Sequence, residues 1–236
     1  MNAQRIGAAV VSTALKWPFA SVPEVPLSTV VGRCLTLACG LLRGLLPARR
    51  RIVLGRGARI SDADSLHISG RTVLIDDYCL VDCNSHEGIT LGRNFKLGTF
   101  SRMFASGTLV NIGKGIVIGD NVGTGEFAQI GGAGGVKIGA DCIFGAFLSV
   151  HPENDIFSDP AHRIREQGLT RSGIEIGSGC WIGVKVTVTV LDGVKIGRGS
   201  VISADSVMTK SFPERSVIGG VPARLMRPID DLTKTE

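Results

Sequence analysis

From about Arg51 onward, an aliphatic residue recurs at every sixth position, usually with a glycine directly after it. The clearest examples are Ile112-Gly113, Ile118-Gly119, Ile138-Gly139, Ile176-Gly177, Ile182-Gly183 and Ile196-Gly197. Six residues make one short strand and one corner, and glycine permits a positive φ or a close backbone approach at the corner. The recurring aliphatic side chain would point inward, where stacked coils bury a continuous column.

This period predicts an all-β parallel β-helix solenoid. It argues against an ordinary β-sandwich, in which turn signals are spaced by about 8–12 residues. The spacing lengthens to eight residues from Ile130 to Ile138 and from Val188 to Ile196, and to ten from Val81 to Leu91. The longest break follows His151, and we expect an excursion loop at about 152–173, a natural place for a functional site.

The composition narrows the class of protein. Glycine makes up 32 of 236 residues, about twice the usual share, without the three-residue period of collagen. A hydrophobic content of 44% excludes a disordered chain. The net charge of +5 comes with no basic stripe interleaved with aromatic residues, so we expect no nucleic-acid partner.

Six cysteines are present, none in a CxxC pair, and Cys142 and Cys180 occupy positions of interior aliphatic residues. A reducing, cytoplasmic location is the simpler interpretation. The apolar run Ile6–Leu15 resembles a signal peptide only faintly, because Lys16 interrupts it and no clean cleavage site follows.

The N-terminal segment 1–50 lies outside the repeat. Its apolar stretch Ser28–Leu46 contains Arg33 and Arg43, which makes it a poor membrane span. We expect an amphipathic helix that covers one end of the domain. Contact of residues 28–51 with an anionic membrane surface, at the inner face, remains the alternative.

Four C-terminal passages resemble the hexapeptide-repeat acyltransferases, and within them the sugar O-acetyltransferases such as galactoside and maltose acetyltransferases: Ile176–Gly183, Gly193–Gly197, Val207–Lys210 and Gly219–Arg224. The segment His151–Pro160, followed by Ile164–Gly168, is similar to the loop of the branch linked to surface-polysaccharide synthesis. The resemblance covers about 51–227.

The resemblance implies a left-handed parallel β-helix over 51–211 and a coenzyme A-contacting tail over 212–236. It also implies a homotrimer with acetyl-CoA in the groove between adjacent subunits. The activity it implies is acetyl-CoA-dependent transfer of an acetyl group to a hydroxyl of a saccharide or nucleotide-sugar acceptor. No metal is expected.

An acceptor hydroxyl needs a base with a pKa near neutral. His151 matches the position of the family's catalytic histidine and is the predicted general base, with His86 as runner-up. His67 and His162 are expected at the surface. Asp155 stands where many relatives carry a second histidine.

The excursion loop offers further charged candidates. Glu166 is a candidate to orient the His151 ring from across the loop. Arg163, Arg165 and Arg171 are candidates to bind an anionic acceptor, with a solvated loop or trimer contacts as equal alternatives.

Carried over position by position, the family's coenzyme A contacts fall on a set of small and basic residues: Gly183, Val184, Ala204, Thr209, Lys210, Arg224 and Arg227. Small residues suit a pantetheine arm passing near the backbone, and Lys and Arg suit phosphates. The two-residue insertion near 189–190 weakens the assignment of Val184.

Three alternatives to O-acetylation stay open. The first is N-acetylation of an amino sugar or amino acid on the same fold. The second is a metal enzyme resembling γ-class carbonic anhydrases, which would need three convergent histidines, whereas His151 and His162 are eleven residues apart. The third is a non-catalytic solenoid, which would leave His151 and the C-terminal motif unexplained.

Overall fold

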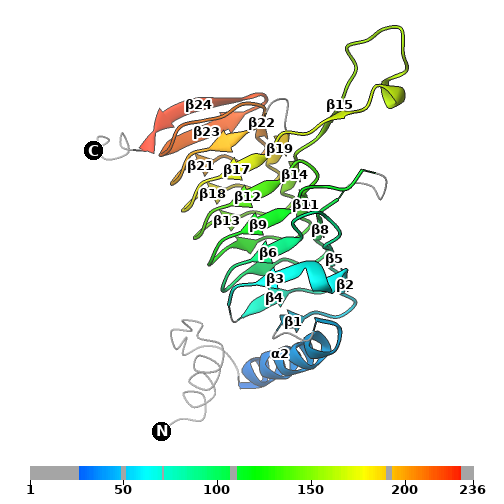
Figure 1. Cartoon of the computed structure of the whole chain (residues 1–236). Helices are drawn as coiled ribbons and strands as arrows, with labels where there is room; N and C mark the ends of the chain where they lie inside the picture. The colour runs from blue at the N-terminus through cyan, green and yellow to red at the C-terminus, as the bar shows by residue number, and fades with distance from the viewer. Residues whose placement is uncertain (1–26, 49–51, 71, 107–110, 190–192, 230–236) are drawn as a thin grey trace, which may run out of the picture.

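A computed structural model describes residues 27–48, 52–70, 72–106, 111–189 and 193–229. In these residues the chain winds into a rod of stacked coils, and successive strands join three different sheets in turn (Figure 1). Apart from the last strand, neighbouring strands in these sheets are parallel. The period of six thus predicts the architecture correctly.

We name the sheets A, B and C in the order in which the chain visits them. Sheet A contains β1 (Ile52–Leu54), β4 (Val73–Ile75), β7 (Lys96–Leu97), β10 (Gly123–Thr124), β13 (Ile143–Phe144), β18 (Trp181–Ile182), β21 (Val201–Ile202), β23 (Ser216–Gly220) and β24 (Ala223–Pro228). Sheet B contains β2 (Arg59–Ser61), β5 (Leu80–Asp82), β8 (Arg102–Phe104), β11 (Gln129–Gly131), β14 (Ser149–His151), β19 (Thr187–Thr189) and β22 (Val207–Met208). Sheet C contains β3 (Leu66–Ile68), β6 (Ile89–Leu91), β9 (Ile116–Ile118), β12 (Val136–Ile138), β17 (Ile174–Ile176) and β20 (Lys195–Ile196).

The recurring aliphatic residues form the core, as predicted. In sheet C, Ile118, Ile138, Ile176 and Ile196 follow one another in register, and each is at most 3% exposed. Burying one such side chain contributes about 1.5–3 kcal/mol. Cys142 and Cys180 are also buried, in line with their aliphatic-like positions, and all six thiols are free.

The glycine after each aliphatic residue is required by close stacking. A Cβ on Gly145 would lie 2.7 Å from the carbonyl carbon of Gly183 in the next coil. The positive φ falls two residues later, and at the corner between sheets A and B it is adopted by large side chains. Sequence reasoning assigned both roles to glycine, and the structure separates them.

Four aromatic residues occupy this A–B corner in successive coils. Tyr78, Phe100, Phe127 and Phe147 have φ between 56° and 59°, and their rings stack with centroid distances of 5.3, 5.3 and 4.9 Å. A bulky residue rarely adopts this backbone conformation, and ring stacking offsets part of the strain.

Extra residues enter the coils at the corner between sheets B and C. The 3₁₀ helix η1 (Ala63–Ser65) and the turns around 83–88 and 132–135 all lie there. The longest excursion leaves after β14 and returns at β17, as predicted for 152–173. It contains the hairpin β15 (Asn154–Asp155) and β16 (Leu169–Thr170) and the 3₁₀ helix η2 (Ile164–Glu166), and it projects from the rod in Figure 1.

The coil continues beyond residue 211, where the sequence-based boundary placed the start of the tail. Phe212 bridges to Ile196, and β23 runs parallel to β21 in sheet A. Strand β24 then folds back antiparallel on β23 and ends the sheet. The first part of the segment 212–236 therefore belongs to the β-helix.

Helix α2 (Leu27–Ala48) covers the N-terminal end of the rod (Figure 1). Gly40 and Gly44 face β1, and Arg43 Nε donates a hydrogen bond of 2.9 Å to the Leu54 carbonyl oxygen. The predicted helix over Ser28–Leu46 and its covering role are confirmed for the described residues.

Gly44→Ala should destabilise this end of the rod by about 1–3 kcal/mol, because its Cβ would clash with the Ile52 carbonyl oxygen. Gly32→Ala is the matched control, since its Cβ would meet nothing within 4 Å, and it should stabilise by up to about 1 kcal/mol through helix propensity. Denaturant unfolding of both variants measures the difference. Equal effects would contradict the close packing of Gly44.

Candidate active site

His151 is the last residue of β14 in sheet B, at the point where the excursion loop begins. Val150 before it is fully buried, so the alternation of a strand turns Ser149 and His151 toward the outside of the rod. Ser149 Oγ lies 2.8 Å from His151 Nε2, a hydrogen bond whose direction depends on the ring tautomer. Sequence reasoning missed Ser149, although its i, i+2 spacing within a strand was a usable signal.

Phe104 forms one wall beside His151. The register of sheet B places Phe104 opposite Gly131, and Gly131 belongs to the strand that pairs with β14. A Cβ on Gly131 would lie 3.0 Å from Phe104 Cε2, so the glycine leaves room for the ring. The Phe104 and His151 ring centroids are 6.2 Å apart.

Burial lowers the pKa of His151 below its usual value, because it removes water that would stabilise the charged form of the imidazole. The negative charge of Glu153 acts in the opposite direction and raises the same pKa. Burial is the larger effect, so the pKa of His151 is lowered on balance and the neutral form of the ring is favoured. A neutral imidazole has one unprotonated nitrogen and can accept a proton.

Arg171 anchors the base of the excursion loop. Its guanidinium lies 3.3 Å from Glu153 Oε2, and it donates to Asn111 Oδ1 at 2.8 Å and to the carbonyl oxygens of Asn111 and Ile112 at 3.0 and 3.3 Å. Its side chain is 18% exposed. In the structure Arg171 holds the base of the loop beside Glu153.

The expectation that Glu166 orients His151 is wrong. Glu166 lies in η2 and forms an exposed ion pair of 3.6 Å with Arg163, whereas Glu153 is the carboxylate that acts on His151. Asp155 is exposed in β15, opposite Leu169.

The other histidines lie apart from His151. His86 is exposed in the turn after β5, and β5 is three strands from β14 in sheet B, about 14 Å along the rod. His67 is exposed on β3 of sheet C, and His162 is exposed and lies 2.7 Å from Asp159 Oδ2. The surface positions predicted for His67 and His162 are confirmed.

Gly183, Val184 and Ala204 meet at the A–B corner of adjacent coils. A Cβ on Gly183 would lie 2.6 Å from the Ala204 nitrogen, so coil stacking by itself accounts for this glycine. The column of stacked aromatic rings at this corner ends with Phe147, because Lys185 and Asp205 take the corresponding positive-φ positions in the next two coils. Val184 is 43% exposed, which leaves an open small-residue surface.

The remaining predicted contacts lie directly after β22 and on β24. Thr209 directly follows β22, and continuing the β19–β22 register places it in the column of His151, two coils further on. Lys210 Nζ lies 5.6 Å from the Phe212 ring centroid. Arg224 and Arg227 are exposed on β24, opposite Gly219 and Val217.

These basic residues have the chemistry that anionic groups require. Within the described part of the chain, neither Lys210 nor Arg224 nor Arg227 forms an ion pair. The charges are thus available to phosphates, and Lys210 follows β22 of sheet B, the sheet that carries Ser149 and His151.

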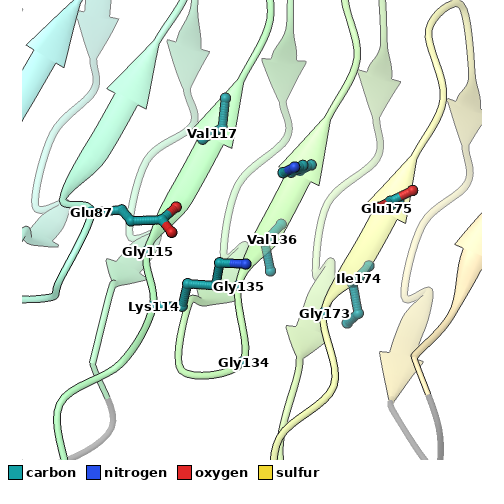
Figure 2. A pocket seen from close by; sticks show the side chains of 11 residues that line it. Glu87, Lys114, Gly115, Val117, Gly134, Gly135, Val136, Gly173, Ile174 and Glu175 are labelled. Carbon is teal, nitrogen blue, oxygen red and sulfur yellow. The ribbon is translucent and has the colours of Figure 1, made fainter.

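A shallow recess lies on sheet C, on the other side of the B–C corner. Figure 2 shows three of its charged side chains, Glu87, Lys114 and Glu175, and Lys137 of β12 lines it as well. It contains none of the predicted site residues. Among the described residues, no group of three His, Cys, Asp or Glu side chains could hold a metal ion.

Comparison with known proteins identifies the class of protein to which the chain belongs. No family model matches the chain. It is 33% identical over 154 residues to the "Putative lipopolysaccharide biosynthesis O-acetyl transferase WbbJ" of Escherichia coli (strain K12), a match that spans 62% of this chain and 74% of WbbJ. A "Putative acetyltransferase SAR2635" of Staphylococcus aureus (strain MRSA252) is 40% identical over 93 residues, 39% of this chain and less than half of that relative, 42%. The galactoside acetyltransferase structure in complex with coenzyme A has a TM-score of 0.41 at 19% identity, covering 100% of this chain and 87% of that one.

The coiled fold and the relatives together define an enzyme of the acyltransferase class. The chain belongs to the hexapeptide-repeat acetyltransferases, because it shares a third of its aligned residues with WbbJ over nearly three quarters of that protein.

Replacing Glu153 by Gln should move the titration midpoint of His151 to lower pH, because the substitution removes the negative charge that raises its pKa. Histidine Cε1–H signals followed by NMR across the acidic range measure the midpoint. Glu175→Gln, on sheet C, is the control and should leave it unchanged. A midpoint that stays put or rises in Glu153→Gln would refute this account of the His151 environment.

Proposed function

We propose that the chain is an acetyl-CoA-dependent O-acetyltransferase that modifies a hydroxyl of a sugar or surface-polysaccharide precursor. The observation that carries the proposal is His151, a half-buried imidazole of lowered pKa that is hydrogen-bonded to Ser149 at the start of the excursion loop. The similarity to WbbJ, which is named as a putative lipopolysaccharide biosynthesis O-acetyl transferase, supports a saccharide acceptor.

In this proposal His151 acts as the general base. A sugar hydroxyl is a poor nucleophile at pH 7, and a positioned base that takes its proton during attack contributes about 10²–10⁴-fold in rate. The lowered pKa keeps the ring in its proton-accepting form. The hydrogen bond between Ser149 Oγ and His151 Nε2 holds the orientation of the imidazole ring, so we assign Ser149 as a positioning residue.

The donor side of the proposed site consists of Gly183, Val184, Ala204, Thr209, Lys210, Arg224 and Arg227. Bound acetyl-CoA would supply an activated thioester. Arg224 and Arg227 offer paired N–H donors to phosphate oxygens, and Lys210 offers a point charge. Their lack of ion-pair partners in the described chain supports this role.

The handedness and assembly of the coils complete the proposal. We assign a left-handed β-helix and a homotrimer, with each site completed between subunits. The exposure of Phe157 and Ile164 on the excursion loop, 71% and 55%, supports a contact of this loop with a second subunit or with the acceptor. Six free thiols fit a cytoplasmic location.

His151→Ala should lower turnover by about 10²–10⁴-fold and leave acetyl-CoA binding nearly intact. Thiol release from acetyl-CoA, measured with panels of sugars, nucleotide sugars and amino sugars, reports turnover and separates O- from N-acetylation. His67→Ala is the matched control and should be silent. Normal turnover in His151→Ala together with loss in His86→Ala would transfer the base to His86, and turnover abolished by a chelator would favour a metal enzyme.

Arg224→Ala should weaken acetyl-CoA binding by about tenfold, because it removes charged donors to a phosphate, and should change turnover at saturating donor little. Titration calorimetry with acetyl-CoA measures the Kd. Arg59→Ala, an exposed arginine of β2 at the other end of sheet B, is the control. An unchanged Kd in Arg224→Ala would remove β24 from the donor site.

A further inference from the structure

Helix α2 has an apolar face that nothing in the described chain covers. Gly40 and Gly44 define the face packed on β1. On the opposite side, five residues fall within an arc of about 80° at 100° per residue. They are exposed in the structure, and we call them the α2 stripe: Val31, Leu35, Ala38, Leu42 and Leu45.

The apolar side chains of the α2 stripe are strongly exposed to solvent. Leu35 and Leu42, at its centre, are 62% and 65% exposed, and Val31 and Leu45 are 49% and 48% exposed. A contiguous apolar strip of this kind is unfavourable in water and indicates a binding surface. Its function is separate from the acetyl-transfer site, since His151 lies on β14 and the helix covers β1.

The position of the helix makes the α2 stripe accessible to a flat surface. Figure 1 shows α2 across the end of the rod, with the coils all on one side of it. The stripe is opposite the face that packs on β1 and so faces away from the coils. A planar partner could therefore contact the whole length of the stripe without meeting the rod.

Charge identifies the partner as anionic. Residues 1–51 contain seven Lys or Arg and one acidic residue, Glu24, a net charge of +6, whereas the whole chain carries +5. The remaining residues 52–236 therefore carry −1. The excess positive charge of the protein is concentrated in the sequence around α2.

This charge also argues against a second copy as the partner, because two such segments would repel each other. The stripe also has only five side chains, whereas a stable protein interface contains about 20–30 residues on each side. In the described part of the chain, no helix is long and apolar enough to cross a membrane. An apolar strip on a helix in a basic stretch of the sequence suits a helix that lies in the plane of a lipid surface.

We propose that α2 is a peripheral membrane helix, which inserts the α2 stripe into an anionic lipid leaflet and holds the rod upright on it. Apolar insertion supplies one part of the binding, and attraction between basic residues and acidic headgroups supplies the other. The proposal is independent of the acetyl-transfer function, so each can fail without the other.

The test is co-sedimentation of the full chain with vesicles of phosphatidylcholine containing about one third phosphatidylglycerol, compared with pure phosphatidylcholine. We expect binding to the anionic vesicles that weakens as salt is raised. Leu35→Gln/Leu42→Gln should reduce that binding by about tenfold or more, since it removes the centre of the stripe. Leu80→Gln/Val117→Gln changes two exposed apolar residues of the coils, and should bind as the unmodified chain does.

A gain-of-binding variant excludes misfolding as the explanation. Ala38→Leu enlarges the stripe and should tighten binding several-fold. Thr36→Leu adds an exposed apolar side chain outside the stripe and should tighten it less. Equal binding to neutral and anionic vesicles, or no response to the Leu35/Leu42 and Ala38 changes, would overturn the proposal.

Two other occupants would also be revealed. If Leu35→Gln/Leu42→Gln lowers the mass of the protein in light scattering without lipid, the stripe joins copies of this chain. If the same variant increases hydrogen exchange in residues 1–26 without lipid, that segment covers the stripe. Either result would replace the lipid surface as the partner.

Discussion

Close stacking of one coil on the next is the constraint on which the rest of the structure depends. Parallel strands pair at about 4.8 Å, so each coil must keep the same outline as its neighbours. The glycine after each inward aliphatic residue permits this approach. At Gly145, for example, a Cβ would lie only 2.7 Å from the carbonyl carbon of Gly183 in the next coil. Extra residues are tolerated where they project outward from the rod and do not separate neighbouring coils. The long excursion and the smaller insertions all occur at the corner between sheets B and C.

The surroundings of His151 follow from this stacking. Register between coils places Phe104 over the space left by Gly131. Glu153 at the start of the excursion and Arg171 at its return form an ion pair at the base of the loop. Burial then lowers the pKa of the imidazole, and Glu153 limits the shift. A rigid stack below and an anchored loop above hold the proposed base in one orientation.

A stack of parallel strands has two open ends, each with unpaired backbone groups. The antiparallel strand β24 closes one end of sheet A, and it carries Arg224 and Arg227. Helix α2 covers the other end and donates the Arg43 hydrogen bond to the Leu54 carbonyl. Each closing element thus presents further chemistry to the outside: basic side chains on β24 and the apolar stripe on α2.

The sequence by itself determined the coil, its inward column of Ile118, Ile138, Ile176 and Ile196, the limits of the excursion and the place of His151 at its start, because a six-residue period records which side chains face inward. The hydrogen bond between Ser149 and His151 was also predictable, since residues i and i+2 share a face of any strand. Phe104, Glu153 and Arg171 were not predictable as neighbours of His151, and Glu166 was chosen wrongly, because insertions of unequal length and an aperiodic loop leave no spacing to count. Only the tertiary structure decided these contacts, since they depend on how far each turn carries the chain before the next strand returns to register.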